Sequence, residues 1–181
     1  MLQPSIMSNE LVTGFSKIHL ALTISGSTIH GKGIFTRSPL PPGTFIFDVV
    51  AEEVYCENNP TLAAMNQNWI GAGLNKWLKV QPGDLGSYLN HSCRPNIMMD
   101  DKFAFYTIST VHENEELLLD YSTTELDPYW QLKCNCGSQE CRSIITSFQF
   151  LPTGLKVQYL PNLSPFLKQE VESMYLHQLA G

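Results

Sequence analysis

The chain has 181 residues, of which 43% are hydrophobic and 15% are charged, with a formal net charge of −6 and a pI near 5.3. This composition is typical of a globular protein rather than a disordered one, and the length suits one core. The acidic balance argues against binding to a nucleic-acid backbone and suits a Lys/Arg-rich protein partner. The N-terminal residues lack the features of a signal peptide, and no stretch approaches the roughly 18 apolar residues of a membrane span.

The first half of the chain predicts short strands separated by turns. Residues 19–24 are rich in β-formers, residues 34–36 begin a second strand, and residues 44–55 contain the apolar run of a well-buried strand. Residues 57–85 mix Ala, Asn, Gly and Trp without a clear period. We interpret them as an insert with a short helix near residues 61–68.

The second half returns to strands. Residues 96–99 and 103–108 flank the polar triplet Asp100-Asp101-Lys102, which predicts a hairpin. A further polar turn at residues 112–115 leads into the apolar stretch that ends at Tyr121.

The C-terminal residues predict a helix. Ser164 is a good N-cap, and Pro165 suits the first helical position. One apolar side of this helix is formed by Phe166, Val171, Met174, Tyr175 and Leu179. Residues 155–160 are ambiguous. The local patterns therefore indicate one β-rich domain with a helical tail.

The cysteines predict a metal site. Three of the five occur in Cys134-x-Cys136-x4-Cys141, and one short loop of this kind can supply three ligands to a tetrahedral structural zinc ion. The fourth ligand must come from elsewhere. The alternative is that the cysteines are reduced and packed as small apolar residues. In either case a reducing, intracellular compartment is favoured, nucleus or cytoplasm.

Two further motifs precede the cysteine loop. The first is Asn90-His91-Ser92-Cys93-x-Pro95-Asn96, and the second is the run Glu116 to Tyr121. In this order the three motifs resemble those of the SET-domain protein-lysine methyltransferases with a C-terminal cysteine (post-SET) segment. The resemblance implies Cys93 as the fourth zinc ligand, and it leaves Cys56 as a buried thiol.

The same resemblance implies a fold and a domain organisation. The expected fold is mainly β, with several small sheets, a pseudoknot, a short helical insert at about 57–85, a zinc loop and a terminal helix. The expected segments are an N-terminal extension (1–16), the SET domain (17–123), the post-SET zinc segment (124–143) and a C-terminal extension with a helix (144–181).

S-adenosylmethionine is the cofactor that the resemblance implies, and a lysine-containing protein, histone or non-histone, is the substrate. The expected cofactor contacts are Gly31, Lys32, Gly33, Tyr88, Asn90 and His91. A glycine pair allows close backbone approach, although Gly-x-Gly is usually just a turn. Alternatively, Asn90 caps its own turn and His91 is a structural core histidine.

Tyr121 is the expected catalytic residue. Methyl transfer is an in-line displacement, so alignment of a neutral lysine nitrogen dominates the barrier. A tyrosine of ordinary pKa, about 10, is a poor base at neutral pH, so proton loss to water is favoured. Tyr106, Tyr129 and Trp130 are the expected wall of a lysine channel, with core packing as the alternative.

Three departures from the family pattern affect substrate and product. Leu119 and Val49 stand where aromatic residues are common, and Ser87-Tyr88 replaces an arginine-aromatic pair. Leu119 favours products beyond monomethyl-lysine. Val49 leaves open the alternative that the chain is an inactive SET module that only binds proteins. A cysteine hydrolase using Cys93 and His91 is a third hypothesis, but its sequence lacks an evident orienting residue.

Overall fold

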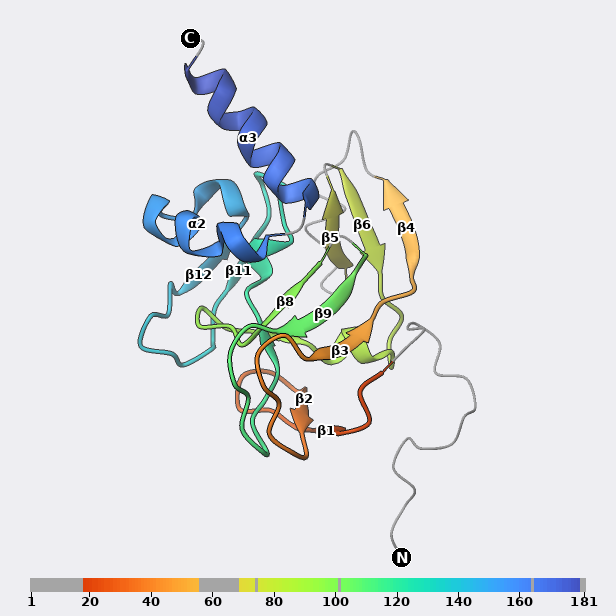
Figure 1. Ribbon diagram of the computed structural model, residues 1–181. Helices are drawn as coiled ribbons and strands as arrows, with labels where there is room; N and C mark the ends of the chain where they lie inside the picture. Colours follow the sequence, from red (N-terminus) through yellow and green to blue (C-terminus); the bar gives the residue numbers. More distant parts are fainter. Residues whose placement is uncertain (1–17, 56–68, 74, 101, 164, 180–181) are drawn as a thin grey trace, which may run out of the picture.

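The computed structural model describes residues 18–55, 69–73, 75–100, 102–163 and 165–179, and Figure 1 shows their arrangement. Within this part of the chain, four small sheets and two α-helices form the protein. The predicted mainly β fold with several small sheets is confirmed. The short helix predicted near residues 61–68 lies outside the described residues.

A two-stranded sheet and a five-stranded sheet form the larger part of the β structure. The two-stranded sheet pairs β1 (Leu22–Gly26) antiparallel with β2 (Lys32–Thr36). The five-stranded sheet has the order β3-β9-β8-β10-β7. Its strands are β3 (Phe45–Asp48), β7 (Asn90–His91), β8 (Ile97–Met99), β9 (Ala104–Thr107) and β10 (Leu118–Leu119). The predicted hairpin is confirmed, since β8 and β9 pair antiparallel.

The five-stranded sheet contains a threaded segment. β10 lies between β7 and β8 and runs parallel to both, with Leu119 opposite His91 on one side and Ile97 on the other. The side chain of Asn96 fixes this register. Its Oδ1 accepts a hydrogen bond from the Leu118 amide at 2.8 Å, and its Nδ2 donates to the Glu116 carbonyl at 2.8 Å. The segment before Tyr121 therefore passes beside the turn that carries Asn90 and His91, which is the predicted pseudoknot arrangement.

The main hydrophobic core lies beneath these sheets. Its fully buried side chains include Ile34, Phe47, Phe105 and Leu117, each 0% exposed. The rings of Phe47 and Phe105 pack 4.9 Å apart between β3 and β9. Val49 belongs to the same core.

The insert contains a sheet that sequence periodicity did not reveal. β5 (Trp69–Gly73) and β6 (Lys76–Lys79) pair antiparallel, and β4 (Glu52–Tyr55) pairs with the other edge of β6. A Cβ on Gly71 would lie 1.8 Å from the Thr124 carbonyl oxygen, so only glycine allows this contact between the insert and the segment after Tyr121.

The C-terminal part adds a hairpin and two helices. β11 (Gln131–Lys133) pairs with β12 (Ile144–Thr146), and α2 (Thr153–Tyr159) precedes α3 (Pro165–Leu179), which extends away from the sheets in Figure 1. The terminal helix is confirmed from Pro165 onward, whereas the ambiguous stretch 155–160 is largely helical. A second core joins the two helices to the loops before them and is formed by Leu126, Phe148, Leu151, Tyr159, Leu163, Leu167 and Val171. Within the described part of the chain, no helix combines the length and apolar character that a membrane crossing requires.

Candidate active site and metal centre

A cavity of about 370 Å³ lies where the insert, the threaded segment and the cysteine segment meet. Its wall includes Ile29, Trp69, Asn90, Tyr121 and Trp130, which come from five separate parts of the chain. Cavities of roughly 300–1,000 Å³ are typical of small-molecule sites. The size and the mixed polar and apolar wall therefore suit a small-molecule ligand.

Asn90 is buried in β7, and the nitrogen of its side-chain amide is held by hydrogen bonds. Nδ2 donates to the carbonyls of His30 and Lys32 at 3.2 and 3.0 Å, and to Glu116 Oε1 at 2.7 Å. The oxygen Oδ1 accepts no hydrogen bond from the described residues. Asn90 thus ties three segments together and still offers one acceptor atom at the cavity.

The two glycines at the start of β2, Gly31 just before it and Gly33 within it, serve the same network. Gly31 has a positive φ of 51°, and a Cβ on Gly33 would lie 2.0 Å from Glu116 Oε1. Glycine at position 33 therefore lets Glu116 reach Asn90. Gly31, Lys32 and Gly33 do not line the cavity, and neither does Tyr88, which packs against the main core. Their contact with a cofactor remains a prediction.

His91 links the cavity wall to the cysteines. Its Nδ1 accepts a hydrogen bond from the Tyr121 amide at 3.2 Å, which leaves the proton on Nε2, 3.4 Å from Cys93 Sγ. Burial lowers the pKa of His91 to about 4, so the ring is neutral at pH 7. This geometry agrees with the alternative that the His91 ring is a structural core histidine. It leaves the His91 backbone available to a ligand.

Tyr121 follows β10 and turns its ring toward His91, with the ring centroids 5.3 Å apart. Its hydroxyl donates a hydrogen bond to the Leu89 carbonyl. Burial raises the pKa of Tyr121 well above its ordinary value. The hydroxyl therefore stays protonated at neutral pH and acts as a donor rather than as a base.

Asp120 is fully buried beside Tyr121 and anchors the surrounding segments. Arg142 donates to both carboxylate oxygens at 2.7 Å, and the Ser122 amide donates to Oδ1 at 3.1 Å. Burial alone would raise the pKa of Asp120, but the hydrogen bonds and charge of Arg142 outweigh it and hold the pKa below its usual range. Sequence reasoning assigned Asp120 no role, although the residue lies inside a recognised motif.

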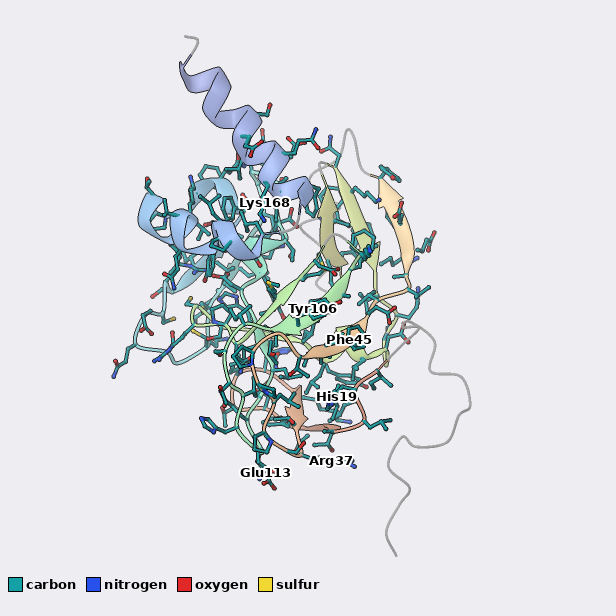
Figure 2. All side chains as sticks on the ribbon, in the orientation of Figure 1. His19, Arg37, Phe45, Tyr106, Glu113 and Lys168 are labelled. Carbon is teal, nitrogen blue, oxygen red and sulfur yellow. The ribbon has the colours of Figure 1, made fainter. Side chains whose placement is uncertain are left out.

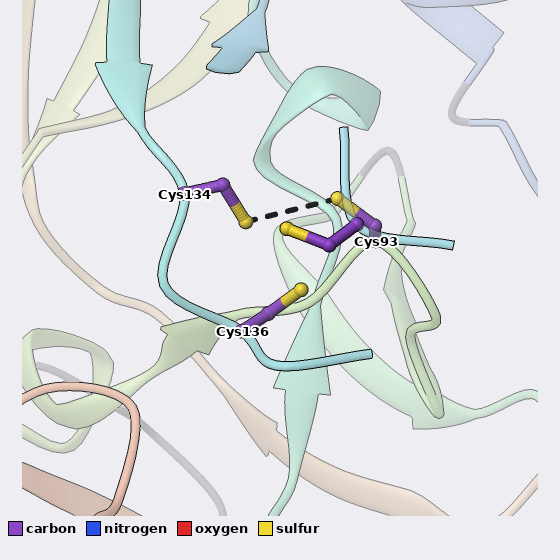
Figure 3. Close-up of side chains that lie close together, drawn as sticks. Cys93, Cys134 and Cys136 are labelled. Carbon is purple, nitrogen blue, oxygen red and sulfur yellow. Dashed lines mark hydrogen bonds between the residues drawn. The ribbon is translucent and has the colours of Figure 1, made fainter. Parts of the chain in front are cut away.

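The four expected zinc ligands gather in one cluster. The Sγ atoms of Cys93, Cys134, Cys136 and Cys141 lie within 4.8 Å of one another, and Figure 3 shows three of them labelled around a common centre. Cys93 and Cys134 are 3.8 Å apart. Tetrahedral zinc with bonds of about 2.3 Å requires sulfurs about 3.8 Å apart. The donor set and spacing thus fit a structural zinc ion.

The expected lysine-channel aromatics separate in space. Trp130 lines the cavity. Tyr129 is 71% exposed, and Tyr106 packs edge-on against Phe45 at 5.6 Å, a pair that Figure 2 labels on neighbouring strands. Neither of these two tyrosines lines the cavity.

Several lining residues went unrecognised in the sequence, Trp69 and Glu125 among them. Trp69 lies in the aperiodic insert, and Glu125 lies in the loop after Tyr121. Neither has a local pattern that predicts its position, since both reach the cavity through tertiary packing.

The structure supports one part of the cysteine-hydrolase hypothesis, the contact between His91 and Cys93, but not the reactivity of Cys93. His91 and Cys93 do meet. However, Cys93 is 6% exposed, and burial raises the pKa of its thiol. A nucleophilic cysteine needs an accessible thiolate, so this site does not suit hydrolysis.

Comparisons with known proteins agree with these features. A family model described as the SET domain matches residues 31–122. Histone-lysine N-methyltransferase ash1 of Drosophila melanogaster is 26% identical over 129 residues, which cover 64% of this chain and 6% of that protein. Histone-lysine N-methyltransferase Su(var)3-9 of Drosophila pseudoobscura pseudoobscura is 27% identical over 171 residues, which cover 76% of this chain and 26% of that protein. The chain thus spans a small part of these relatives.

Two solved structures share the fold. The methyltransferase domain of human SETMAR superposes with a TM-score of 0.56 at 21% identity, over 72% of this chain and 59% of that chain. KRYPTONITE in complex with mCHG DNA and SAH has a TM-score of 0.56 at 18% identity, over 72% of this chain and 30% of that chain.

Proposed function

The chain belongs to the SET-domain family, and from this premise we propose that it transfers a methyl group from S-adenosylmethionine to a lysine side-chain amine in a protein. Histones are the first substrates to test, because the matched relatives are histone-lysine methyltransferases. Chromatin would place the activity in the nucleus. The acidic chain makes direct nucleic-acid binding unexpected, although the KRYPTONITE structure contains DNA.

The observation that carries this proposal is the convergence of Asn90, His91 and Tyr121 on one cavity. These residues come from two segments 30 positions apart, which the parallel pairing of β10 with β7 brings together. The arrangement supplies polar groups for a cofactor and a hydroxyl for a reacting amine within one cavity.

The residues present fit the proposed cofactor. When bound, S-adenosylmethionine supplies an electrophilic methyl group on a sulfonium. Asn90 Oδ1, the free acceptor, would receive a hydrogen bond from the cofactor's amino group, while the His91 backbone would meet its adenine. The SAH in the KRYPTONITE structure supports an adenosyl cofactor for this fold.

Tyr121 would orient the substrate. Its hydroxyl donates its one proton to the Leu89 carbonyl, so the oxygen can accept a hydrogen bond from the amine, but the hydroxyl cannot remove a proton at neutral pH. The lysine would therefore lose its proton to water before attack. Alignment of the amine with the sulfonium methyl is then the main contribution of the protein.

The cysteine cluster would stabilise one wall of the site. Leu132 and Ile145, on the hairpin that flanks the cysteine loop, line the cavity. Zinc held by the four cysteines would join this loop to Cys93, three residues after Asn90. The cavity would then depend on the metal for its shape.

The direct test is incubation of the full chain with isotope-labelled S-adenosylmethionine, core histones and cell lysate, followed by mass spectrometry of labelled lysines. Labelled lysine with the wild type, and far less of it with Tyr121→Phe, would support the proposal. Cofactor binding without labelling of any lysine would favour an inactive protein-binding module, the reading that Val49 in the buried core leaves open.

A further inference from the structure

Glu125 is a buried carboxylate in the cavity wall, four residues after Tyr121 and 5% exposed. Its Oε1 accepts hydrogen bonds from the Leu126 and Asp127 amides at 2.8 and 2.7 Å, and its Oε2 accepts one from Trp77 Nε1 at 2.9 Å. A carboxylate has about four acceptor positions. Three are used within the described structure, so one position on Oε2 remains open.

A second buried carboxylate lies two residues further on. Asp127 is 7% exposed, and its Oδ1 accepts a hydrogen bond from the Tyr129 amide at 2.9 Å. Its Oδ2 is buried and has no hydrogen-bond partner among the described residues. Burial, and after it the neighbouring charge of Asp127, raises the pKa of Glu125. Both carboxylates are therefore buried with at least one acceptor position that has no hydrogen-bond donor among the described residues.

No basic side chain of the described residues forms an ion pair with Glu125 or Asp127, although Lys133 also lines the cavity. Among the described residues, the carboxylates that do form ion pairs are those of Glu52, Glu53 and Asp120. Buried charges are normally paired because leaving one unpaired is strongly unfavourable. Closing the turn at 125–127 and holding Trp77 would give Glu125 a structural role. That role explains neither the open acceptor position on Glu125 Oε2 nor why no basic side chain of the described residues forms an ion pair with this carboxylate.

The proposed reaction brings a suitable cation into this cavity. A lysine side chain has an ordinary pKa of about 10.4, so it arrives as an ammonium ion. Entry into this cavity, whose wall includes Trp69 and Trp130, removes water from the ammonium group, at a cost that a carboxylate can offset. We propose that Glu125, supported by Asp127, binds the ammonium group of the substrate lysine as that side chain enters the cavity. This inference rests on the proposed function for its substrate class.

The binding step can be measured without methyl transfer. The chain has three tryptophans, and one of them, Trp77, donates its indole N–H to Glu125. Its indole resonance in a ¹H–¹⁵N spectrum therefore reports on the Glu125 carboxylate, and Trp77→Phe assigns the signal. The probes are Nα-acetyl-lysine amide, its uncharged analogue Nα-acetyl-norleucine amide, and Nα-acetyl-Nε-trimethyl-lysine amide, whose side-chain nitrogen is charged but carries no hydrogen.

The full chain should bind the lysine probe at least about tenfold more tightly than the norleucine probe, since a charge-assisted hydrogen bond contributes at least this factor. Loss of the N–H should weaken binding of the trimethyl probe. In Glu125→Gln, the preference for the lysine probe over the norleucine probe should disappear. Binding to this variant is followed through the indole resonances of Trp69 and Trp130. Glu113→Gln removes one exposed charge elsewhere and should keep the preference. Asp127→Asn, which retains the Oδ1 acceptor, should reduce it partly.

Equal binding of lysine and norleucine probes by the wild type would overturn the inference, as would an unchanged preference in both Glu125→Gln and Asp127→Asn. If Glu125→Gln does not fold, Asp127→Asn alone decides. The outcome is separable from the methylation test. Methylation without lysine preference refutes the role of Glu125 alone, whereas a preference lost in Glu125→Gln without methylation refutes the proposed enzyme activity alone.

Discussion

The hydroxyl of Tyr159 in α2 donates a 2.7 Å hydrogen bond to Oδ2 of Asp120, the residue before Tyr121. Arg142, which follows the last cysteine of the cluster, binds the same carboxylate. The helical C-terminal extension and the cysteine segment therefore meet at one buried charge beside the candidate catalytic residue. Both segments fall outside the part of the chain that the family model matches, residues 31–122.

Replacing Tyr159 with phenylalanine should destabilise the fold. The change removes one donor from a fully buried carboxylate, and hydrogen bonds to charged groups contribute about 1.5–3 kcal/mol. Urea denaturation should show a lower midpoint with an unchanged slope. Tyr129→Phe, at an exposed tyrosine, is the matched control and should have no effect. Equal stability of Tyr159→Phe and the wild type would show that the other donors satisfy Asp120 alone.

One zinc ion should be found per chain, and Cys93→Ser should lower both metal content and stability. Metal binding free energy is in part folding free energy when the ligands come from distant segments. Atomic emission measures the metal, and thermal unfolding with and without a chelator measures the coupling. Cys136→Ser should behave in the same way. Cys56→Ser, outside the four-cysteine cluster, serves as the control for loss of a thiol, and full zinc occupancy in Cys93→Ser would refute the ligand assignment.

Cofactor affinity should depend on Asn90. Asn90→Ala removes the free Oδ1 acceptor and should weaken binding of S-adenosylmethionine by about 1–3 kcal/mol, the range for an unsatisfied polar partner. Isothermal titration calorimetry gives the affinity directly. Asn96→Ala is the contrasting variant, because Asn96 is buried and holds β10 but does not line the cavity. It should lower stability and leave affinity nearly unchanged. An unaltered affinity in Asn90→Ala would assign this residue to capping alone.

The sequence anticipated those parts of the site that depend on local patterns. The turn at Asp100 predicts the β8–β9 hairpin, and the spacing of the cysteines predicts a shared centre, because both are properties of neighbouring residues. Asn90 and Tyr121 were expected to converge through the family resemblance. The pairing of Leu119 with His91 is the contact that brings them together.

Contacts between distant elements were not predictable in this way. Trp69 lines the cavity and Tyr159 binds Asp120 next to Tyr121, both from segments without a motif, and their positions follow from tertiary packing. Trp130 and Tyr129 are adjacent aromatics of similar character, yet only Trp130 lines the cavity. Local sequence does not distinguish them, since the turn that precedes β11 decides which ring faces inward.

Tyr121→Phe should reduce turnover while preserving zinc content and cofactor affinity. The variant keeps the ring beside His91 and removes the one hydroxyl proposed to orient the amine. We expect a loss of about 10²–10³ in rate, the scale for one preorganised catalytic hydrogen bond. The wild-type rate should rise with pH as lysine loses its proton. It should show no decline at the ordinary tyrosine pKa of about 10, because burial raises the pKa of Tyr121. Undiminished turnover in Tyr121→Phe would exclude the catalytic role.

Leu119 should influence how many methyl groups are added. Leu119 is 2% exposed and lines the cavity two residues before Tyr121, where it offers no hydroxyl to hold a water molecule beside the amine. The space is then open to a methylated amine, so the wild type should form products beyond monomethyl-lysine. Leu119→Tyr adds both bulk and a hydroxyl and should shift the mixture toward fewer methyl groups. Leu119→Met, similar in volume and without a hydroxyl, should retain the wild-type distribution. A mass-spectrometric time course distinguishes these outcomes, and a wild type that stops at monomethyl-lysine would contradict this interpretation of Leu119.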